Sequence, residues 1–335
     1  MSATNRQIRL AARPQGEIKP TDWEHVDAPA GAPGEGEVAG VTRFISLDPA
    51  MRGWLNDVRS YVPPVAIGEV MRAGSVIEVT ESNHPDYAVG DHVVGMFGVQ
   101  SHVVTDGKGA LKVDASAAPL ATYLGALGMP GMTAYFGLLD VGALGEGETV
   151  LVSGAAGAVG SMVGQIAKVK GARVIGIAGG PEKCALLTDE LGFDAALDYR
   201  ADDFAAQLRA ATPDRVDVYF DNVGGEILDL ALTRLNMRAR VVICGAISQY
   251  NNETAVRGPA NYLSLLVSRA RMEGFIVFDY ARRYREAAAE IAGWIAEGRM
   301  VTKETVVRGG IDDFPETLQM LFRGDNVGKL VLEVA

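Results

Sequence analysis

Five apolar runs after residue 126 alternate with amphipathic stretches, and this alternation limits the fold more than any other feature. Strands of a parallel sheet are buried on both faces and read as continuous apolar runs, whereas the helices between them keep one polar face. We therefore expect an α/β domain with a doubly wound parallel sheet of the Rossmann type. The expected strands are residues 149–153, 173–178, 216–221, 240–244 and 274–278, and the expected helices are residues 160–170, 181–191, 204–211, 225–235 and 259–271.

The first third of the chain has a different pattern. Short β-forming runs at residues 75–80, 91–96 and 101–104 lie between Gly, Pro and Asp turns, which is typical of a β-rich domain. After a further expected helix at 284–297, two more β-like runs follow at 305–307 and 329–334. We expect this tail to rejoin the first domain, so that the α/β domain is an insertion.

The length of 335 residues exceeds the roughly 250–300 at which single cores usually divide into domains. The expected boundaries are 1–126 for the β-rich domain, 127–298 for the Rossmann domain and 299–335 for the return to the first domain.

Composition narrows the classes of partner. The net charge of −11 repels phosphate backbones and anionic lipids, which argues against broad binding of nucleic acid or membranes. No stretch reaches the roughly 18 consecutive apolar residues of a membrane span, and residues 1–10 are too polar for a secretory signal. The two cysteines, Cys184 and Cys244, and four histidines without ligand spacing predict no metal site. Such sparse cysteine use suits a reducing compartment, so we expect a cytoplasmic protein.

A glycine-rich turn connects the first apolar run to the helix that follows it. Gly154, Gly157 and Gly160 come directly after the strand expected at 149–153. Glycines there permit a tight turn, a close approach of the backbone to a pyrophosphate and close packing of helix on strand. The first N–H groups of the helix and its dipole then face the phosphate oxygens. The turn predicts a dinucleotide site; the alternative is a tight turn with only a structural role.

The end of the second strand indicates which dinucleotide is bound. Sites for NAD place a carboxylate there to bind the ribose 2′-hydroxyl, but Ala178, Gly179 and Gly180 occupy this position. The space suits a 2′-phosphate, which Lys183 could bind as a point charge and Tyr199 as a hydroxyl donor. We therefore expect NADPH/NADP+, although Lys183 could also be an ordinary exposed lysine.

Two further strand ends lie at the carboxyl edge of the sheet, where ligands of open α/β sheets bind. Asn222 follows one strand and is expected to contact ribose or phosphate, and the small residues 244–248 follow another and leave room for a nicotinamide ring. Both could instead be ordinary glycine turns. The chain contains no Gly-x-Ser-x-Gly, Gly-x-x-x-x-Gly-Lys or His-Glu-x-x-His motif, so hydrolase, phosphotransferase and metalloprotease functions have no support.

Several of these segments resemble one known family. Residues 128–139, 155–161, 220–225, 244–251 and 324–329 closely resemble the prostaglandin reductase (leukotriene B4 12-hydroxydehydrogenase) family of the zinc-independent medium-chain dehydrogenases/reductases. Residues 47–53 and 60–65 look like its bacterial branch, which includes NADPH-dependent curcumin reductase. The matches run in the same order along nearly the whole chain.

The resemblance implies a GroES-like β domain built from both termini, an inserted Rossmann domain and a homodimer. It implies reduction of the carbon–carbon double bond of small α,β-unsaturated ketones or aldehydes by NADPH. It also implies that the strand carrying residues 275–277 lines the cofactor and forms the dimer edge. The positions expected to contact the cofactor are Ala156, Gly157, Ala158, Val159, Gly160, Gly180, Lys183, Tyr199, Asn222, Cys244, Gly245, Ala246, Ile247, Ser248, Tyr250, Phe275, Ile276, Val277 and Asn326.

The reaction needs a hydride at the β-carbon, stabilisation of charge on the carbonyl oxygen and a proton at the α-carbon. A phenol is neutral at pH 7 and can donate a hydrogen bond or a proton. The candidate catalytic donors are Tyr250 and Tyr61, with surface packing as the alternative for each. Related sequences often carry Tyr where this chain has Ala50, which puts their substrate preference in doubt here.

Three other functions remain open. An NADPH:quinone reductase would use the same domains on a quinone as acceptor. A non-catalytic NADPH-binding protein would bind the cofactor and oxidise it with no acceptor, and a scaffold that uses the fold only for protein contacts would not bind it at all.

Overall fold

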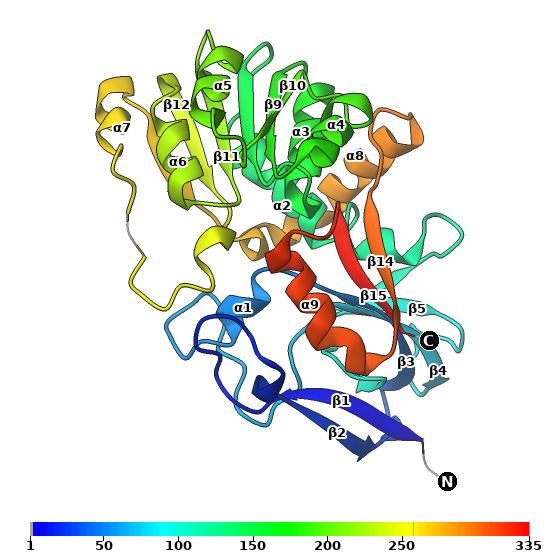
Figure 1. The fold of residues 1–335 in the computed structure, drawn as a ribbon. Coiled ribbons are helices and arrows are strands. Elements are labelled where there is room, and N and C mark those ends of the chain that lie inside the picture. Colours follow the sequence, from blue (N-terminus) through cyan, green and yellow to red (C-terminus); the bar gives the residue numbers. More distant parts are fainter. Residues whose placement is uncertain (1–2, 257, 335) are drawn as a thin grey trace. The chain divides into compact units, whose positions relative to one another are not determined.

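The computed structural model describes residues 3–256 and 258–334, and these form two compact units. Unit 1 comprises Met1–Leu124 and Glu304–Ala335, and unit 2 comprises Gly125–Lys303. The chain therefore leaves unit 1, builds unit 2 and returns, so the expected insertion is confirmed (Figure 1).

Unit 2 is built on one six-stranded parallel sheet. Its strand order is β10-β9-β8-β11-β12-β13, so the chain starts in the middle, winds outward to one edge and then winds to the other. The direction of winding reverses between β8 and β11, which pair in parallel through Val150 and Val218. The strands are β8 (Thr149–Ser153), β9 (Arg173–Ala178), β10 (Ala195–Asp198), β11 (Val216–Asp221), β12 (Leu235–Ile243) and β13 (Arg271–Gly274).

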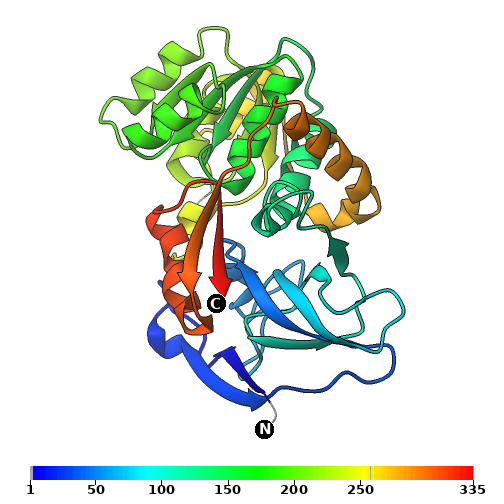
Figure 2. The same ribbon diagram turned by 90° about the vertical axis from the view of Figure 1, so that its right-hand side faces the viewer.

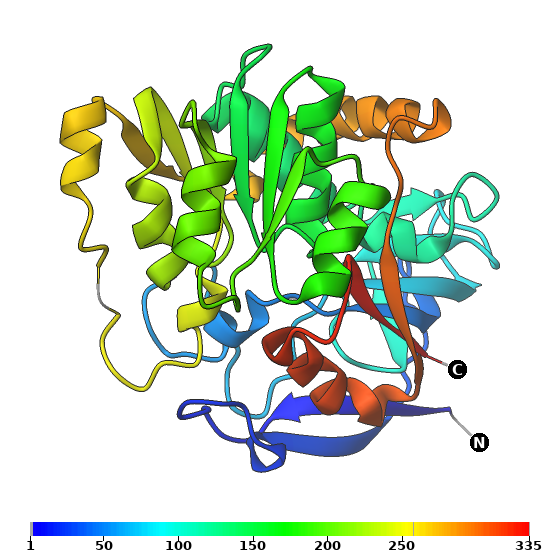
Figure 3. The same ribbon diagram turned by 45° about the horizontal axis from the view of Figure 1, so that its top comes forward.

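Helices cover both faces of this sheet, as the apolar runs predicted (Figures 1 and 3). Alternate residues of β8 point to opposite faces, with Val150 and Val152 in one core cluster and Leu151 in the other. The first cluster packs under α2 (Met129–Phe136), α3 (Ala158–Val169), α4 (Pro181–Asp189) and α8 (Tyr284–Ala296); the second packs under α5 (Phe204–Ala211), α6 (Gly225–Leu232) and α7 (Leu263–Ser268). Three short helical elements complete the unit: η3 (Gly137–Val141), η4 (Ile247–Gln249) and η5 (Val277–Arg283).

Most expected elements of unit 2 are confirmed, but both edge strands differ from expectation. The short strand β10 was not expected at all. The last strand was expected at residues 274–278, whereas β13 is Arg271–Gly274. Its residues are mostly polar because, in the part of the chain that the structure describes, it pairs with β12 alone. The apolar residues that suggested a strand serve the core instead, since Phe275 packs edge-on against Phe220 with ring centroids 6.4 Å apart.

Unit 1 is β-rich. A two-stranded antiparallel sheet pairs β1 (Thr4–Leu10) with β2 (Trp23–Pro29). A seven-stranded sheet has the order β14-β15-β3-β4-β5-β7, with β6 also paired to β3. The strands of this sheet are β3 (Val38–Ser46), β4 (Ser75–Ser82), β5 (His92–Gly95), β6 (His102–Thr105), β7 (Leu111–Val113), β14 (Glu304–Gly309) and β15 (Lys329–Val334). The helical elements of unit 1 are η1 (Pro20–Asp22), α1 (Met51–Trp54), η2 (Leu120–Leu124), η6 (Ile311–Asp313) and α9 (Phe314–Arg323).

The C-terminal strands are integral to unit 1. Strand β15 pairs with β3 in antiparallel register, with Val331 opposite Ser46, and β14 lies beside β15 (Figure 2). A buried ion pair reinforces this junction. Lys329 donates to Asp48 Oδ1 and to the carbonyl of Leu47, both at 2.6 Å, while only 2% of its side chain is exposed. Burial lowers the pKa of Lys329, although Asp48 opposes this shift.

Candidate dinucleotide-binding site

The glycine turn after β8 forms a cradle that no larger residue could form. Gly154 has a φ of +59°, which favours glycine. A Cβ on Gly160 would lie 2.3 Å from the carbonyl oxygen of Gly154, so the first turn of α3 packs directly on the loop. Gly157 is the N-cap of α3 and supplies no capping side chain, which leaves the first N–H groups of a 12-residue helix to bind an anion. The residues present fit a pyrophosphate.

A buried hydrogen-bond network joins this turn to the end of β11. Asp221 is 1% exposed, and its Oδ1 accepts hydrogen bonds from Ser153 Oγ and from Tyr219 OH, both at 2.8 Å. The backbone N–H groups of Val223 and Gly224 donate to the same oxygen at 3.0 Å. Burial and the nearby carboxylate raise the pKa of Tyr219 well above its ordinary value, so its hydroxyl keeps the proton it donates.

The same network fixes Asn222. Its backbone N–H donates to Ser153 Oγ at 2.9 Å, and its side-chain Nδ2 donates to the carbonyl of Ser153 at 2.7 Å. Asn222 is half-buried. It therefore has one defined orientation beside the glycine turn, as a ligand contact at this edge requires.

The turn after β12 is tied to the same loop. Cys244 N–H and Gly245 N–H donate to the carbonyl of Asp221 at 2.9 and 3.1 Å. Ser248 Oγ donates to the carbonyl of Val223 at 2.6 Å. Burial and the nearby Asp221 raise the pKa of the Cys244 thiol to about 12. The thiol is therefore protonated at neutral pH and is not a nucleophile.

Tyr250 folds back over this turn. Its hydroxyl oxygen accepts a hydrogen bond from Ala246 N–H at 3.2 Å, and a Cβ on Gly245 would lie 3.0 Å from that oxygen. The second candidate donor, Tyr61, belongs to unit 1. Its side chain is 48% exposed, and its hydroxyl accepts a hydrogen bond from Trp54 Nε1 at 3.1 Å.

The end of β9 is open beside Gly180. Gly180 has a φ of +95°, and among the described residues the one atom within 4 Å of a Cβ placed on it would be an Arg200 nitrogen. Pro181 starts α4 at once, and Lys183 lies in the first turn of that helix. Tyr199 follows β10 and is 45% exposed; its hydroxyl would lie 3.1 Å from a Cβ on Gly179. Two predicted residues, Lys183 and Tyr199, therefore come from elements that meet at this strand end.

The two units match known proteins along their length. Residues 6–113 match the family model described as the N-terminal domain of oxidoreductase, and residues 158–293 match the model described as zinc-binding dehydrogenase. The chain is 44% identical to NADPH-dependent curcumin reductase of Escherichia coli (strain K12), with 99% of this chain and 97% of that protein covered. It is 39% identical to the NADP(+)-dependent 2-alkenal reductase of Nicotiana tabacum, with 99% and 98% covered.

The chain belongs to the medium-chain dehydrogenase/reductase family. A solved structure of CurA from Vibrio vulnificus in complex with NADPH is similar to this dehydrogenase/reductase with a TM-score of 0.94. The two sequences are 43% identical, and the match covers 98% of this chain and 99% of the other.

In this medium-chain dehydrogenase/reductase, most predicted cofactor residues gather at one edge of unit 2. Residues 156–160, Gly180, Lys183, Tyr199, Asn222 and the 244–250 turn all follow the carboxyl ends of β8 to β12. Residues 275–277 follow β13 at the same edge, with Phe275 turned against Gly137. Asn326 belongs to unit 1, where it is 9% exposed and donates through Nδ2 to the carbonyl of Gly328 at 3.0 Å.

Three residues of this dehydrogenase/reductase site were not anticipated. Ser153 orients Asn222, Asp198 accepts a hydrogen bond from Gly180 N–H at 2.9 Å, and Arg200 lies over the end of β9. The sequence could have indicated Ser153 and Asp198, because each is a polar residue at the end of an apolar strand. Arg200 offered no comparable signal, because strand β10 before it is short.

Trp54 belongs to the core of unit 1 and Met132 to the core of unit 2. Trp54 is 3% exposed and Met132 is 2% exposed. Tyr280 stacks on Phe136 with ring centroids 4.7 Å apart. Tyr262 is instead 58% exposed on the surface.

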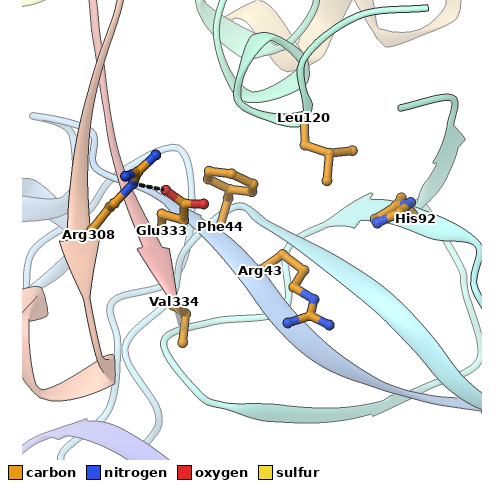
Figure 4. A pocket seen from close by; sticks show the side chains of 7 residues that line it. All are labelled: Arg43, Phe44, His92, Leu120, Arg308, Glu333 and Val334. Carbon is orange, nitrogen blue, oxygen red and sulfur yellow. Dashed lines mark hydrogen bonds and ion pairs between the residues drawn. The ribbon is translucent and has the colours of Figure 1, made fainter. Parts of the chain in front are cut away.

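A separate cavity of about 360 Å³ lies in unit 1 (Figure 4). Its basic groups have acidic neighbours, since Arg43 pairs with Glu78 and Arg308 pairs with Glu333. None of the predicted site residues lines it. The lining residues are Arg43, Phe44, His92, Leu120, Arg308, Glu333 and Val334.

Within residues 3–256 and 258–334, no three His, Cys, Asp or Glu side chains gather as a metal site would require. None of the helices in the described part of the chain is long and apolar enough to cross a bilayer.

Proposed function

We propose that the protein reduces the carbon–carbon double bond of α,β-unsaturated ketones and aldehydes with NADPH. The observation that carries the proposal is the combination of a pyrophosphate cradle at Gly154–Gly160 with a β9 end that bears no carboxylate. The printed activities of the curcumin and 2-alkenal reductases support the choice of acceptor.

In this proposal, the predicted cofactor residues bind different parts of NADPH. The N-terminus of α3 binds the pyrophosphate, and Lys183 and Tyr199 bind the 2′-phosphate. Asn222, residues 244–248, residues 275–277 and Asn326 contact the ribose and nicotinamide. NADPH, when bound, supplies the hydride for the β-carbon.

Tyr250 is our first candidate for the group that stabilises the carbonyl oxygen and returns a proton. Its position over the Gly245–Ala246 backbone supports this role, since the N–H of Ala246 donates to the phenol oxygen. A hydrogen-bonded hydroxyl is pre-oriented, and pre-oriented donors stabilise developing charge most effectively. Tyr61 is the second candidate.

Product analysis tests the proposal. The purified protein is given NADPH with a panel of enones, enals and quinones; NADPH oxidation is followed by absorbance, and each product is identified by mass spectrometry. Saturation of the conjugated double bond supports the proposal. Reduction of quinones alone would favour a quinone reductase, and tight NADPH binding without oxidation by any acceptor would favour a non-catalytic protein.

We also propose a homodimer formed through unit 2. Strand β13 pairs with β12 on one side only, within the described residues. Nearby, α7 exposes Leu263 (57%), Leu266 (73%) and Val267 (70%). Free strand edges and large exposed apolar patches mark association sites. Light scattering should give twice the chain mass, and Leu266→Asp should give one chain mass; a monomeric wild type would contradict the proposal.

The cytoplasm is the proposed location. Cys184 and Cys244 are both free thiols, which suits a reducing compartment. Cell fractionation with a tagged chain tests this, and recovery in a secreted fraction would contradict it.

A further inference from the structure

A cation that the sequence did not single out lies over the open end of β9. Strand β10 runs parallel to β9 with Asp198 opposite Ala178. The chain therefore leaves β10 beside the Gly179–Gly180 end, and Tyr199 N–H donates to the carbonyl of Ala178 at 3.1 Å. Arg200 is the next residue, and its side chain is exposed.

The guanidinium of Arg200 is directed at the two glycines. Its Nε would lie 3.1 Å from a Cβ on Gly179, and a terminal nitrogen would lie 4.0 Å from a Cβ on Gly180. The guanidinium carbon lies 5.7 Å from the centroid of the Tyr199 ring, within the range of a cation–π contact. The Tyr199 ring and Arg200 Nε fill the space beside Gly179, whereas a Cβ on Gly180 would meet, among the described atoms, a single Arg200 nitrogen, so the cation borders open space beside Gly180.

A carboxylate holds the backbone of this arrangement in place. Asp198 Oδ1 accepts hydrogen bonds from Gly180 N–H and from Arg200 N–H, both at 2.9 Å. One oxygen thereby links the end of β9 to the residue after β10. These backbone hydrogen bonds, with Arg200 nearby, lower the pKa of Asp198, so the link persists at neutral pH.

Some other arginines of unit 2 are used in ion pairs, as Arg240 is with Glu148 and Arg283 is with Asp140. Within residues 3–256 and 258–334, the Arg200 guanidinium has no such carboxylate partner. Its charge interacts with the Tyr199 phenol and, more weakly, with Asp198. The donors on its outer edge are therefore available to an anion.

We propose that Arg200 is a ligand of the 2′-phosphate of NADPH and determines, with Tyr199, the preference for NADPH over NADH. A guanidinium presents two parallel N–H donors and binds phosphate oxygens in a bidentate manner. The Tyr199 ring lies beside the guanidinium at the strand end, and Asp198 holds the backbone of Arg200 through its N–H. This inference rests on the proposed function for the identity of the nucleotide.

Equilibrium binding tests the inference without enzyme turnover. Calorimetry gives the dissociation constants of NADP+, NAD+ and adenosine 2′,5′-bisphosphate for the wild type, Arg200→Ala, Arg200→Lys and Arg209→Ala. Arg209 is the matched control, because it is an exposed arginine of the same unit, on α5. Thermal unfolding of each variant confirms that it is folded.

The loss of a charge-assisted hydrogen bond weakens binding about tenfold or more. Arg200→Ala should raise the dissociation constants of NADP+ and the bisphosphate by that factor and change that of NAD+ less than about twofold. Arg200→Lys should recover part of the lost affinity for NADP+, since lysine keeps the positive charge but lacks the two parallel N–H donors of the guanidinium. Arg209→Ala should match the wild type.

The assignment would be overturned if Arg200→Ala lost equal affinity for NADP+ and NAD+, or if it kept the wild-type affinity for NADP+. An equal loss in Arg209→Ala would also overturn it, because the effect would then be one of net charge. Failure of the proposed function looks different: the wild type would bind NADPH with Arg200 as described and reduce no enone or enal.

Discussion

Ser153 Oγ donates a hydrogen bond to Asp221 Oδ1 at 2.8 Å and so joins the ends of β8 and β11. These are the two strands between which the direction of winding reverses, and ligands of doubly wound sheets bind at that point. The same Ser153 oxygen accepts the backbone N–H of Asn222. The packing of the sheet and the shape of the candidate site therefore depend on one buried network.

Asp221→Ala should lower both stability and cofactor affinity. The substitution leaves four donors around Oδ1 without their acceptor, two of them backbone N–H groups. We expect the free energy of unfolding to fall by about 2–4 kcal/mol. Denaturant unfolding and calorimetric binding of NADP+ measure the two effects. Asp214→Asn, at an exposed position, is the control, and a stability equal to the wild type in Asp221→Ala would refute the network's role.

Gly160→Ala should abolish dinucleotide binding. The added Cβ would lie 2.3 Å from the Gly154 carbonyl oxygen, so α3 must move away from the loop, at about 1–3 kcal/mol. Gly293→Ala is the control, since its Cβ meets nothing within 4 Å in helix α8. That variant should be more stable by roughly 0.5–1 kcal/mol. Unfolding midpoints and NADP+ binding distinguish the two variants, and full NADP+ affinity in Gly160→Ala would show that the cradle lies elsewhere.

Tyr250→Phe should lower kcat far more than it weakens cofactor binding. Without the hydroxyl, the enolate oxygen or the α-carbon loses its donor, and general acid catalysis is worth about a hundredfold or more. Steady-state kinetics with a saturating enone measures kcat. Tyr262→Phe, at a tyrosine that is 58% exposed, should be unchanged. If kcat is the same in both variants, solvent or Tyr61 supplies the proton.

Acid should remove a contribution that Asp194 makes to stability. Burial alone would raise its pKa, but Lys168 at 2.9 Å and the backbone N–H of Val174 outweigh burial and lower it. A lowered folded pKa gives stability that is present above the ordinary value, about 4, and is lost as pH falls through the folded value. The stability difference between the wild type and Asp194→Asn should therefore be largest at neutral pH and vanish in acid. Urea unfolding at a series of pH values measures it, and a difference independent of pH would contradict this assignment.

The central strands could be predicted from the sequence, whereas the edge strands could not. Strands β8, β9 and β11 are buried on both faces, so most of their residues are apolar and the apolar runs indicate where the strands lie. Strands β10 and β13 each have four residues and one neighbouring strand. One-sided pairing demands less apolar surface, and the apolar Phe275 that suggested a strand packs into the core instead.

Some residues of the candidate site could likewise be predicted from the sequence, and others could not. Gly154, Gly157 and Gly160 are contiguous, so the loop was visible in the sequence. The position of Arg200 depends on the register of β10 against β9, which places residue 198 opposite residue 178. Such non-local pairing leaves no local pattern, so Lys183 was predicted and Arg200 was not.

The proposed reduction of the carbon–carbon double bond by NADPH is tested most directly by following a labelled hydride into the product. NADPH deuterated at the nicotinamide C4 is incubated with the wild-type protein and a simple enone, and the product is analysed by NMR. We predict the saturated ketone with one deuterium at the β-carbon and a solvent-derived hydrogen at the α-carbon. An allylic alcohol with deuterium on the carbinol carbon, or unreacted enone, would contradict the proposed function.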